Sequence, residues 1–374
     1  MWVLCEGSQR VLENVERLEP LLDDAEALGV TDLFVQVYRG GRAWFASTLA
    51  DSGPHQQLTW REGTDDALTI LVRRAQERGF RVHAWVNVLS LASNTDAPIL
   101  RDLGKEIVSV DQKGRSVLDF PGFEVPAPDR GWYRMGTPAV WLDPAAPGVA
   151  QRLAATFDEL LARYPTLDGL HLDYIRYADV LPFTPGTRFG VGLSFGFGEA
   201  SRARFQQETG LLAPFGASLQ NGNRFDDWRR QQLTSLVAAI ATGARTTRPG
   251  VEVSAAVIAD AERAYLVDFQ DWVGWLDSAH IDFAVPMLYT LDPALLRVGV
   301  ESLAGLARSR QIWVGLGTWL FSDRPLDGVG QLRQVTNEEA LGSALFSWDA
   351  IREAPELRAA LAEEVAAGVA AGPR

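Results

Sequence analysis

The sequence has little of several features that would assign its chemistry at once. Its 374 residues include a single cysteine, Cys5, which excludes an intrachain disulfide. The four histidines form no HxH or HExxH pair, which disfavours a metal-dependent hydrolase. No GxGxxG or Walker-type loop follows the first predicted strand, which disfavours nucleotide binding. We therefore expect no metal and no cofactor.

Charge and hydropathy exclude further classes. The chain has 35 Lys and Arg against 48 Asp and Glu, a net charge of −13, which disfavours nucleic acid and anionic membrane as partners. No apolar run approaches the roughly 18 to 20 residues that span a bilayer, so we expect no membrane insertion. We see no export signal in the chain as given, which leaves its location open between the cytoplasm and export followed by trimming.

Strand-like and helix-like segments alternate along the whole chain. Apolar residues recur at three- and four-residue spacing between the strand-like segments, as in amphipathic helices. The predicted strands cover residues 2–6, 31–39, 81–89, 167–174, 251–259, 281–289, 311–319 and 340–348. The predicted helices cover residues 15–30, 66–80, 149–165, 225–249, 268–279, 293–310 and 352–368.

Eight strands that alternate with helices predict an α/β fold, a (β/α)8 TIM barrel. We expect residues 1–374 to form one barrel domain. The connections after strands 2, 3 and 4 are long, and the last two read as loop insertions over about 90–148 and 178–225. Long loops on one face of a barrel usually build a substrate cleft.

The segment LDGLHLDYIRY, residues 167–177, is the most informative part of the chain. Side chains of a strand alternate between its faces, so Leu170 and Leu172 share one face while His171 and Asp173 share the other. This pattern fits a barrel strand whose apolar face packs on helices. Asp173 then lies at the carboxyl end of the strand, where (β/α)8 enzymes keep their chemistry.

The same alternation, applied to the other strands, predicts a ring of polar and aromatic side chains at the barrel mouth. Carboxylates and amides bind sugar hydroxyls, and aromatic faces stack on sugar rings. This ring therefore favours a carbohydrate ligand. Its expected members are Glu6, Gln36, Tyr38, Arg39, Asn87, Asp173, Arg176, Tyr177, Asp260, Tyr289, Trp319, Trp348 and Asp349.

Glycoside hydrolysis requires two carboxyl groups. We expect Asp173 to be the nucleophile or the carboxylate that stabilises the oxocarbenium ion, with Arg176 holding it ionised. Asp260 is the first candidate for the acid and Glu6 the second. Structural alternatives stay open, since Asp260 could cap a helix and Glu6 could pair with Arg39.

The chain resembles the bacterial family-10-like glycosyl hydrolases over nearly its whole length. The segments that carry the resemblance are FVQVYRGGRAWF (34–45), AWVNVL (84–89), WLDPAAPGVAQRL (141–153), LDGLHLDYIRY (167–177), DWVGWLDSAHIDFAVPMLY (271–289), VGLGTW (314–319) and ALFSW (344–348). The resemblance implies a (β/α)8 glycosidase whose substrates include cell-wall glycan strands. It carries functional positions over to Asp173, Arg176, Tyr177 and Asn87. Many relatives have two adjacent acids where this chain has Leu172 and Asp173.

These observations predict a glycoside hydrolase that cleaves an O-glycosidic bond in a polysaccharide or cell-wall glycan. In this hypothesis Gln36, Tyr38, Asn87 and Tyr289 bind hydroxyls, and Trp319 and Trp348 stack on a sugar ring. Arg39, Arg176 and Tyr177 complete the substrate-binding set. One alternative is a non-catalytic glycan-binding TIM barrel. Another is a phosphate-handling isomerase or aldolase, for which the glycines of strand 7 give some support.

Overall fold

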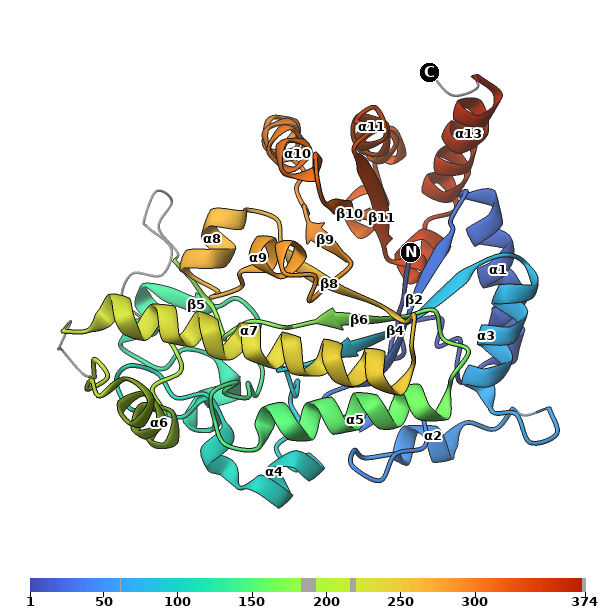
Figure 1. Ribbon diagram of the computed structural model, residues 1–374. Helices are drawn as coiled ribbons and strands as arrows, with labels where there is room; N and C mark the ends of the chain where they lie inside the picture. Colours follow the sequence, from blue (N-terminus) through green and yellow to red (C-terminus); the bar gives the residue numbers. More distant parts are fainter. Residues whose placement is uncertain (61, 183–192, 216–219, 372–374) are drawn as a thin grey trace.

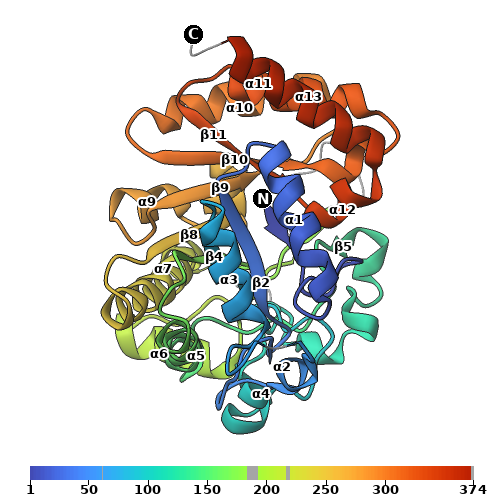
Figure 2. The same cartoon turned by 90° about the vertical axis from the view of Figure 1, so that its right-hand side faces the viewer.

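A computed structural model describes residues 1–60, 62–182, 193–215 and 220–371, and it contains the predicted barrel (Figures 1 and 2). All neighbouring pairs along the order β1-β2-β4-β6-β8-β9-β10-β11 are parallel. Among the described residues no strand pairing joins β1 to β11, so the barrel is nearly closed. Each predicted strand range contains one observed strand. These strands are β1 (Trp2–Val3), β2 (Asp32–Arg39), β4 (Arg81–Asn87), β6 (Gly169–Asp173), β8 (Glu252–Ile258), β9 (Phe283–Met287), β10 (Gln311–Gly317) and β11 (Leu341–Phe346).

Helices surround the strands on the outside (Figures 1 and 2). Their apolar residues face the sheet, as in α5, where Leu153, Phe157 and Leu160 are buried at helical spacing. None of the described helices is both long enough and apolar enough to cross a bilayer. The longer outer helices are α1 (Leu18–Ala27), α3 (Ala67–Glu77), α5 (Val149–Arg163), α7 (Gly222–Thr247), α10 (Pro293–Ala307), α11 (Pro325–Thr336) and α13 (Pro355–Ala371). Two short helices, α9 (Trp272–Asp277) and α12 (Trp348–Glu353), join them.

The long connections predicted after strands 2, 3 and 4 contain short elements of their own. Strand β5 (Tyr133–Met135), in the connection after β4, pairs antiparallel with β7 (Val180–Pro182), in the connection after β6. The two insertions are therefore joined to each other. Residues 183–192 and 216–219 of the predicted 178–225 insertion lie outside the described residues. The remaining elements are β3 (Arg42–Ala43), α2 (Gly53–Gln57), α4 (Pro98–Leu103), α6 (Glu199–Thr209) and α8 (Ala261–Leu266), with 3-10 turns at Val15–Arg17, Lys105–Ile107, Val117–Asp119, Pro121–Phe123, Asp129–Gly131 and Thr318–Phe321.

Aromatic rings fill the interior of the barrel. Phe283 and Trp313 stack with ring centroids 4.1 Å apart, and Phe34 stacks on His171 at 4.2 Å. The inward-facing cluster is distinct from the larger core between strands and helices, which confirms the predicted alternation on most strands. The interior cluster is Trp2, Phe34, Trp85, Ala256, Phe283, Val285 and Ala344, with Leu4, Met287, Trp313 and Phe346 against it.

The two inward histidines belong to this packed interior, as expected from the sequence. The Trp2 indole donates a hydrogen bond to Nε2 of His171 at 3.1 Å, and Nδ1 of His171 lies 2.8 Å from the Ser254 hydroxyl. Nε2 of His83 lies 2.8 Å from a carboxylate oxygen of Asp32. Because Trp2 and His171 come from β1 and β6, side chains of these two strands meet in the barrel interior.

One outer helix, α11, was absent from the sequence-based prediction. Its sequence contains Gly328 and Gly330, and glycine costs about 1 kcal/mol in a helix interior relative to alanine. Tertiary packing compensates for this cost, because Val329, Leu332 and Val335 are buried. A Cβ on Gly328 would come within 3.0 Å of Phe321 and Leu357, so glycine permits the close approach of these neighbours.

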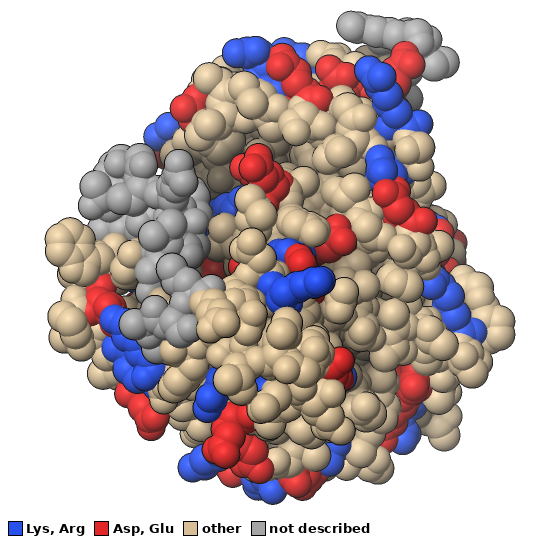
Figure 3. Space-filling view, turned by 60° about the vertical axis from the view of Figure 1, so that its left-hand side comes forward, with Lys and Arg blue, Asp and Glu red and all other residues tan. Residues whose placement is uncertain are grey.

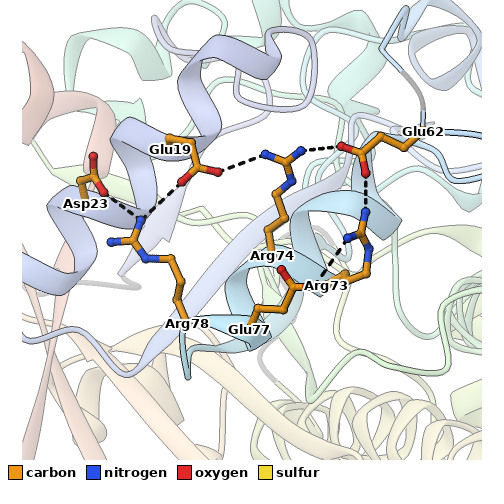
Figure 4. A network of polar contacts seen from close by, with 7 residues as sticks. All are labelled: Glu19, Asp23, Glu62, Arg73, Arg74, Glu77 and Arg78. Carbon is orange, nitrogen blue, oxygen red and sulfur yellow. Dashed lines mark hydrogen bonds and ion pairs between the residues drawn. The ribbon is translucent and has the colours of Figure 1, made fainter.

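A network of ion pairs lies on the outer surface of α1 and α3 (Figure 4). Arg74 of α3 pairs with Glu19 of α1 and with Glu62 of the preceding loop. Arg78, the C-cap of α3, pairs with Glu19 and with Asp23 of α1. These contacts connect adjacent helices on the side of the barrel.

Candidate active site

The carboxyl ends of the strands lie toward the left-hand side of Figure 1, and Figure 3 turns this side forward. Acidic and basic side chains gather there around a hollow (Figure 3). Gln36, Asn87 and Asp173 reach this end from the adjacent strands β2, β4 and β6. The structure thus brings together three of the predicted site residues at the floor of the mouth.

Asp173 is the buried carboxyl group of this floor, with 6% of the residue exposed. The Trp85 indole donates a hydrogen bond to Oδ2 at 3.1 Å, and the Tyr174 backbone N–H donates to Oδ1 at 2.7 Å. Burial raises the pKa of Asp173 above that of an ordinary aspartate, and the Arg176 charge and the two donors offset only part of this effect. The protonated form is therefore more populated than for an ordinary aspartate at any given pH.

Two amides lie beside this carboxyl group. Asn87 is the register neighbour of Asp173 on the adjacent strand, and its side-chain oxygen accepts a hydrogen bond from the Gln36 amide at 3.2 Å. The Gln36 oxygen in turn accepts hydrogen bonds from the backbone N–H of Cys5 at 3.4 Å and from its thiol at 3.2 Å. Gln36 therefore connects the start of the barrel to its floor, and both amides are nearly buried.

An aromatic wall, formed by Tyr289, Trp319 and Phe346, follows the ends of β9, β10 and β11. Trp319 meets Tyr289 edge to face at 4.8 Å and Phe346 at 5.5 Å. Trp319 is 42% exposed, so part of its ring is free to contact a ligand. The Tyr289 hydroxyl is buried without a hydrogen-bond partner among the described residues, and burial, with a smaller contribution from the Asp173 charge, raises its pKa well above the ordinary value.

Arg176 lies on the other side of Asp173, and its guanidinium group packs on two aromatic rings. Its central carbon is 5.0 Å from the Tyr174 ring centroid and 5.4 Å from that of Trp141. Its charge lowers the pKa of Asp173, which is the direction expected from the sequence, although burial is the larger effect. Arg176 is almost fully buried, so it acts on the site mainly through Asp173 and the rings.

Glu6 forms ion pairs with both Arg39 and Arg42, which confirms the predicted alternative that it pairs with Arg39. These three side chains line a polar hollow of about 550 Å³, together with Asp51, Asn94, Asp96 and Arg101 and with backbone around Gly40 and Leu91–Ser93. Two guanidinium groups stabilise the negative charge of Glu6. Arg39 is the last residue of β2, so the hollow lies at the same carboxyl end of the barrel as the floor of the mouth.

Three residues predicted to bind substrate lie elsewhere. Tyr38 points outward and meets Phe157 of α5 edge to face, because a bulge between Gln36 and Tyr38 breaks the alternation of β2. Trp348 is fully buried behind the barrel, where its indole donates a hydrogen bond to Asp24 of α1 at 3.0 Å.

Tyr177, the third, is also buried and does not line the mouth. Its ring meets Phe269 edge to face at 5.4 Å, and the guanidinium group of Arg229 lies 5.9 Å from it. Strand β6 ends at Asp173 and Tyr174 adopts a left-handed conformation, so the alternation that holds within β6 does not extend to Tyr177. Tyr38, Tyr177 and Trp348 are therefore packed in the core, and the prediction that they line the barrel mouth is wrong.

The two remaining mouth acids have structural partners. Asp260 is the exposed N-cap of α8 and accepts a hydrogen bond from the Arg263 backbone N–H at 3.0 Å, so the helix-cap alternative is confirmed. Asp349 is buried and accepts hydrogen bonds from the backbone N–H groups of Gln9 and Leu4, which fixes the segment after β1. In the described parts of the chain no group of three or more His, Cys, Asp or Glu side chains could hold a metal ion.

Several residues near Asp173 were not predicted from the sequence. Phe346 could have been found, because it follows the inward-facing Ala344 by two positions. Tyr174 could not, because it adopts a left-handed backbone conformation with a φ of 51° that breaks the strand alternation. Trp141 reaches the site from the long insertion after β4, whose path the sequence pattern does not reveal.

Comparison with solved structures identifies glycosidase barrels of the same fold. The catalytic domain of a β-amylase from Paenibacillus polymyxa matches with a TM-score of 0.60 at 12% identity, covering 98% of this chain and 97% of the other. A β-galactosidase from Marinomonas ef1 matches with a TM-score of 0.62 at 13% identity, covering 100% of this chain and 60% of the other. At such low identity the similarity establishes the TIM-barrel fold alone.

Comparison of sequences identifies curated relatives that are named glycosyl hydrolases. DigH of Escherichia coli K12 is 26% identical over 286 residues, covering 72% of this chain and 56% of the relative. YngK of Bacillus subtilis 168 is 22% identical over 298 residues, covering 75% of this chain and 50% of the relative. The chain spans about half the length of these relatives. The model of the family described as glycosyl hydrolase-like 10 matches residues 1–296, and the chain therefore belongs to this family.

Proposed function

We propose that the protein hydrolyses an O-glycosidic bond in a polysaccharide or cell-wall glycan, with Asp173 and Glu6 as its two carboxyl groups. The observation that carries this proposal is the buried Asp173 at the end of β6, held by Trp85, whose ring meets Phe346 of the aromatic wall edge to face at 6.0 Å. Family membership and the names of the relatives support the reaction class.

The position of Glu6 across the barrel supports its pairing with Asp173. Trp2 of β1 and His171 of β6 are hydrogen-bonded across the interior. Asp173 follows His171 by two residues and Glu6 follows Trp2 by four, toward the same end of the barrel. Among the other predicted acids, Asp260 is exposed and caps a helix, which makes it the weaker candidate.

The environments of the two carboxyl groups suggest their roles. A buried carboxyl group with a raised pKa suits a proton donor, and a carboxylate held by guanidinium groups suits the ionised partner. We therefore assign proton donation to Asp173, in place of the nucleophile role expected from the sequence, and the ionised role to Glu6.

In the reaction, Asp173 gives its proton to the glycosidic oxygen while the bond between that oxygen and the anomeric carbon breaks. The bonding electron pair leaves with the oxygen, which becomes a hydroxyl group. Glu6 either attacks the anomeric carbon, forming a bond that water then breaks with Asp173 as the base, or takes a proton from the attacking water and returns it to solvent. Its distance from Asp173 decides between retention and inversion. Water supplies the hydroxyl group at the anomeric carbon and the proton that restores Asp173.

The binding groups of the mouth fit a neutral polyol. The exposed part of Trp319 offers a face for a sugar ring, and the Tyr289 hydroxyl and the Asn87 amide offer polar groups to its hydroxyls. The hollow next to Glu6 adds further charged and amide side chains for a neighbouring sugar. An extended glycan would thus contact the floor, the aromatic wall and the hollow.

The proposal is tested by incubating a glycan panel, including cell-wall strands stripped of peptide, with the wild type, Asp173→Asn and Glu6→Gln. Asp277→Asn is the matched control, because Asp277 is an exposed acid on α9 that pairs with Arg310. We expect new reducing ends with the wild type and the control, and their loss with the two site variants. Equal cleavage by Asp173→Asn would refute the assignment.

Non-catalytic glycan binding is the second candidate, and one observation favours it. Glu6 is engaged by two arginines and Asp173 by two N–H donors, so both carboxyl groups also fit a purely structural role. Glycan binding without cleavage, weakened by Trp319→Ala, would establish this candidate instead.

A further inference from the structure

Behind Asp173, two acidic and two basic side chains alternate, and all but the partly exposed Arg263 are buried. Nε of Arg176 is 3.9 Å from Oδ1 of Asp179, and Oδ2 of Asp179 is 3.3 Å from Nη2 of Arg263. Nε of Arg263 is 3.8 Å from Oδ2 of Asp268. With Asp173 at one end, acidic and basic groups alternate from the floor of the mouth to the fully buried Asp268.

Asp179 has little freedom within this arrangement. A Cβ on Gly136 would come 2.4 Å from Oδ2 of Asp179, so the carboxylate packs directly against the Gly136 backbone. The Gly136 N–H also donates a hydrogen bond to the Asp179 carbonyl oxygen at 2.9 Å. The pairing of β5 with β7 brings these two segments together. The insertion after β4 thus fixes the acid that follows β6.

Arg176 interacts with two sets of carboxyl groups. It acts on Asp173 on one side and on Asp179 and Asp268 on the other. Its Nε and Nη1 atoms make no hydrogen bond to any described residue, so no carboxylate binds the group in a bidentate manner. Its guanidinium group packs on two aromatic rings, and its influence on Asp173 is electrostatic.

We propose that Asp179 is a positioning residue that holds Arg176 and sets how much of its positive charge acts on Asp173. This inference rests on the proposed function of Asp173. Asp179 would touch no substrate. Removing its charge leaves Arg176 less neutralised, which stabilises ionised Asp173. Removing Arg263 has the opposite effect, because Asp179 then neutralises Arg176 more completely.

The Asp173 pKa, measured without any substrate, tests this proposal. Aspartate labelled with ¹³C at its side-chain carboxyl carbon is followed by NMR across a pH titration, and Asp173→Asn identifies the Asp173 resonance. We expect Asp179→Asn to lower the Asp173 pKa and Arg263→Gln to raise it, each by roughly half a pH unit or more. Asp277→Asn, the exposed control, should leave it unchanged.

Opposite shifts would not follow from a merely structural role. An Asp173 pKa that stays constant in both variants would overturn the proposal, and so would shifts of the same sign. If Asp179→Asn fails to fold, the sign of the Arg263→Gln shift still decides. If the pKa values move as expected but no glycan is cleaved, the proposed function fails while the positioning role stands. If glycans are cleaved but the Asp173 pKa does not move, the positioning role fails while the proposed function stands.

Discussion

The Trp85 indole donates a hydrogen bond to Oδ2 of Asp173 across 3.1 Å, between the adjacent strands β4 and β6. Trp85→Phe removes this donor while keeping most of the apolar ring. Because the bond stabilises the ionised carboxylate, its loss should raise the Asp173 pKa by about one unit. A ¹³C carboxyl titration measures the change. A lowered Asp173 pKa would show that the indole does not stabilise the carboxylate.

The same substitution has a kinetic consequence. If Asp173 donates a proton, activity falls as pH rises through its pKa, so Trp85→Phe should move the alkaline limb of kcat/KM to higher pH. Trp132→Phe is the control, since Trp132 is 67% exposed on the insertion after β4. A shift of the acid limb alone would assign Asp173 to the ionised role.

The exposed face of Trp319 makes this residue the expected sugar platform. Trp319→Ala should weaken glycan binding by about tenfold or more, because an aromatic contact contributes on the order of 1 kcal/mol beyond the area it buries. Stability should change little, since the ring is 42% exposed. Calorimetric titration with an oligosaccharide checks the affinity. Trp132→Ala, at an exposed residue of the insertion, is the control. If Trp319→Ala bound glycan as tightly as this control, Trp319 would have no role in binding.

Substitution of Trp348 should lower stability without affecting glycan binding, the opposite of what is expected for Trp319. Its indole bonds Asp24, which also pairs with Arg352 and Arg358, so Trp348 connects the barrel to α1, α12 and α13. Trp348→Phe should lower the free energy of unfolding by about 1–3 kcal/mol and leave glycan affinity unchanged. Urea unfolding and the same titration measure both. If Trp348→Phe lost glycan affinity while its free energy of unfolding stayed unchanged, Trp348 would instead belong to the substrate site.

Asp268 predicts a pH dependence of stability. Burial and the neighbouring Asp179 carboxylate raise the pKa of Asp268 to about 7 in the folded protein, against an ordinary value of 3.8. Its stabilising contribution is therefore complete below about pH 3.8 and is lost as pH rises through 7. Relative to the wild type, Asp268→Asn should gain stability as pH rises from 4 to 8. If the free energy of unfolding of the wild type and of Asp268→Asn changed equally with pH from 4 to 8, the raised pKa of Asp268 would be contradicted.

The sequence predicted the barrel well because the physics of this fold is local and periodic. Alternation along each strand predicted the inward rows of β4, β6 and β10, including Asn87 and Asp173. It failed where the backbone leaves the regular strand. The bulge in β2 turned Tyr38 outward, and the left-handed conformation of Tyr174 displaced the residues after β6.

The rest of the site depends on contacts between segments far apart in the sequence. Asp179, Arg263 and Asp268 come together only because α8 and the insertions pack behind β6, and no spacing along the chain marks them as a group. The pairing of Glu6 with Arg42 likewise depends on how β3 returns against β2. Sequence periodicity identifies strands and their faces, whereas such clusters require the tertiary fold.

The most direct test of the central claim compares Asp173→Asn with the wild type on two substrates that differ in their leaving group. Hydrolysis of a natural glycan needs a proton donor, whereas an aryl glycoside with a strongly acidic phenol leaves without one. We predict that Asp173→Asn lowers glycan hydrolysis by about 10²–10⁴-fold and lowers aryl glycoside hydrolysis far less. Wild-type rates of glycan hydrolysis by Asp173→Asn, or equal losses on both substrates, would contradict proton donation by Asp173.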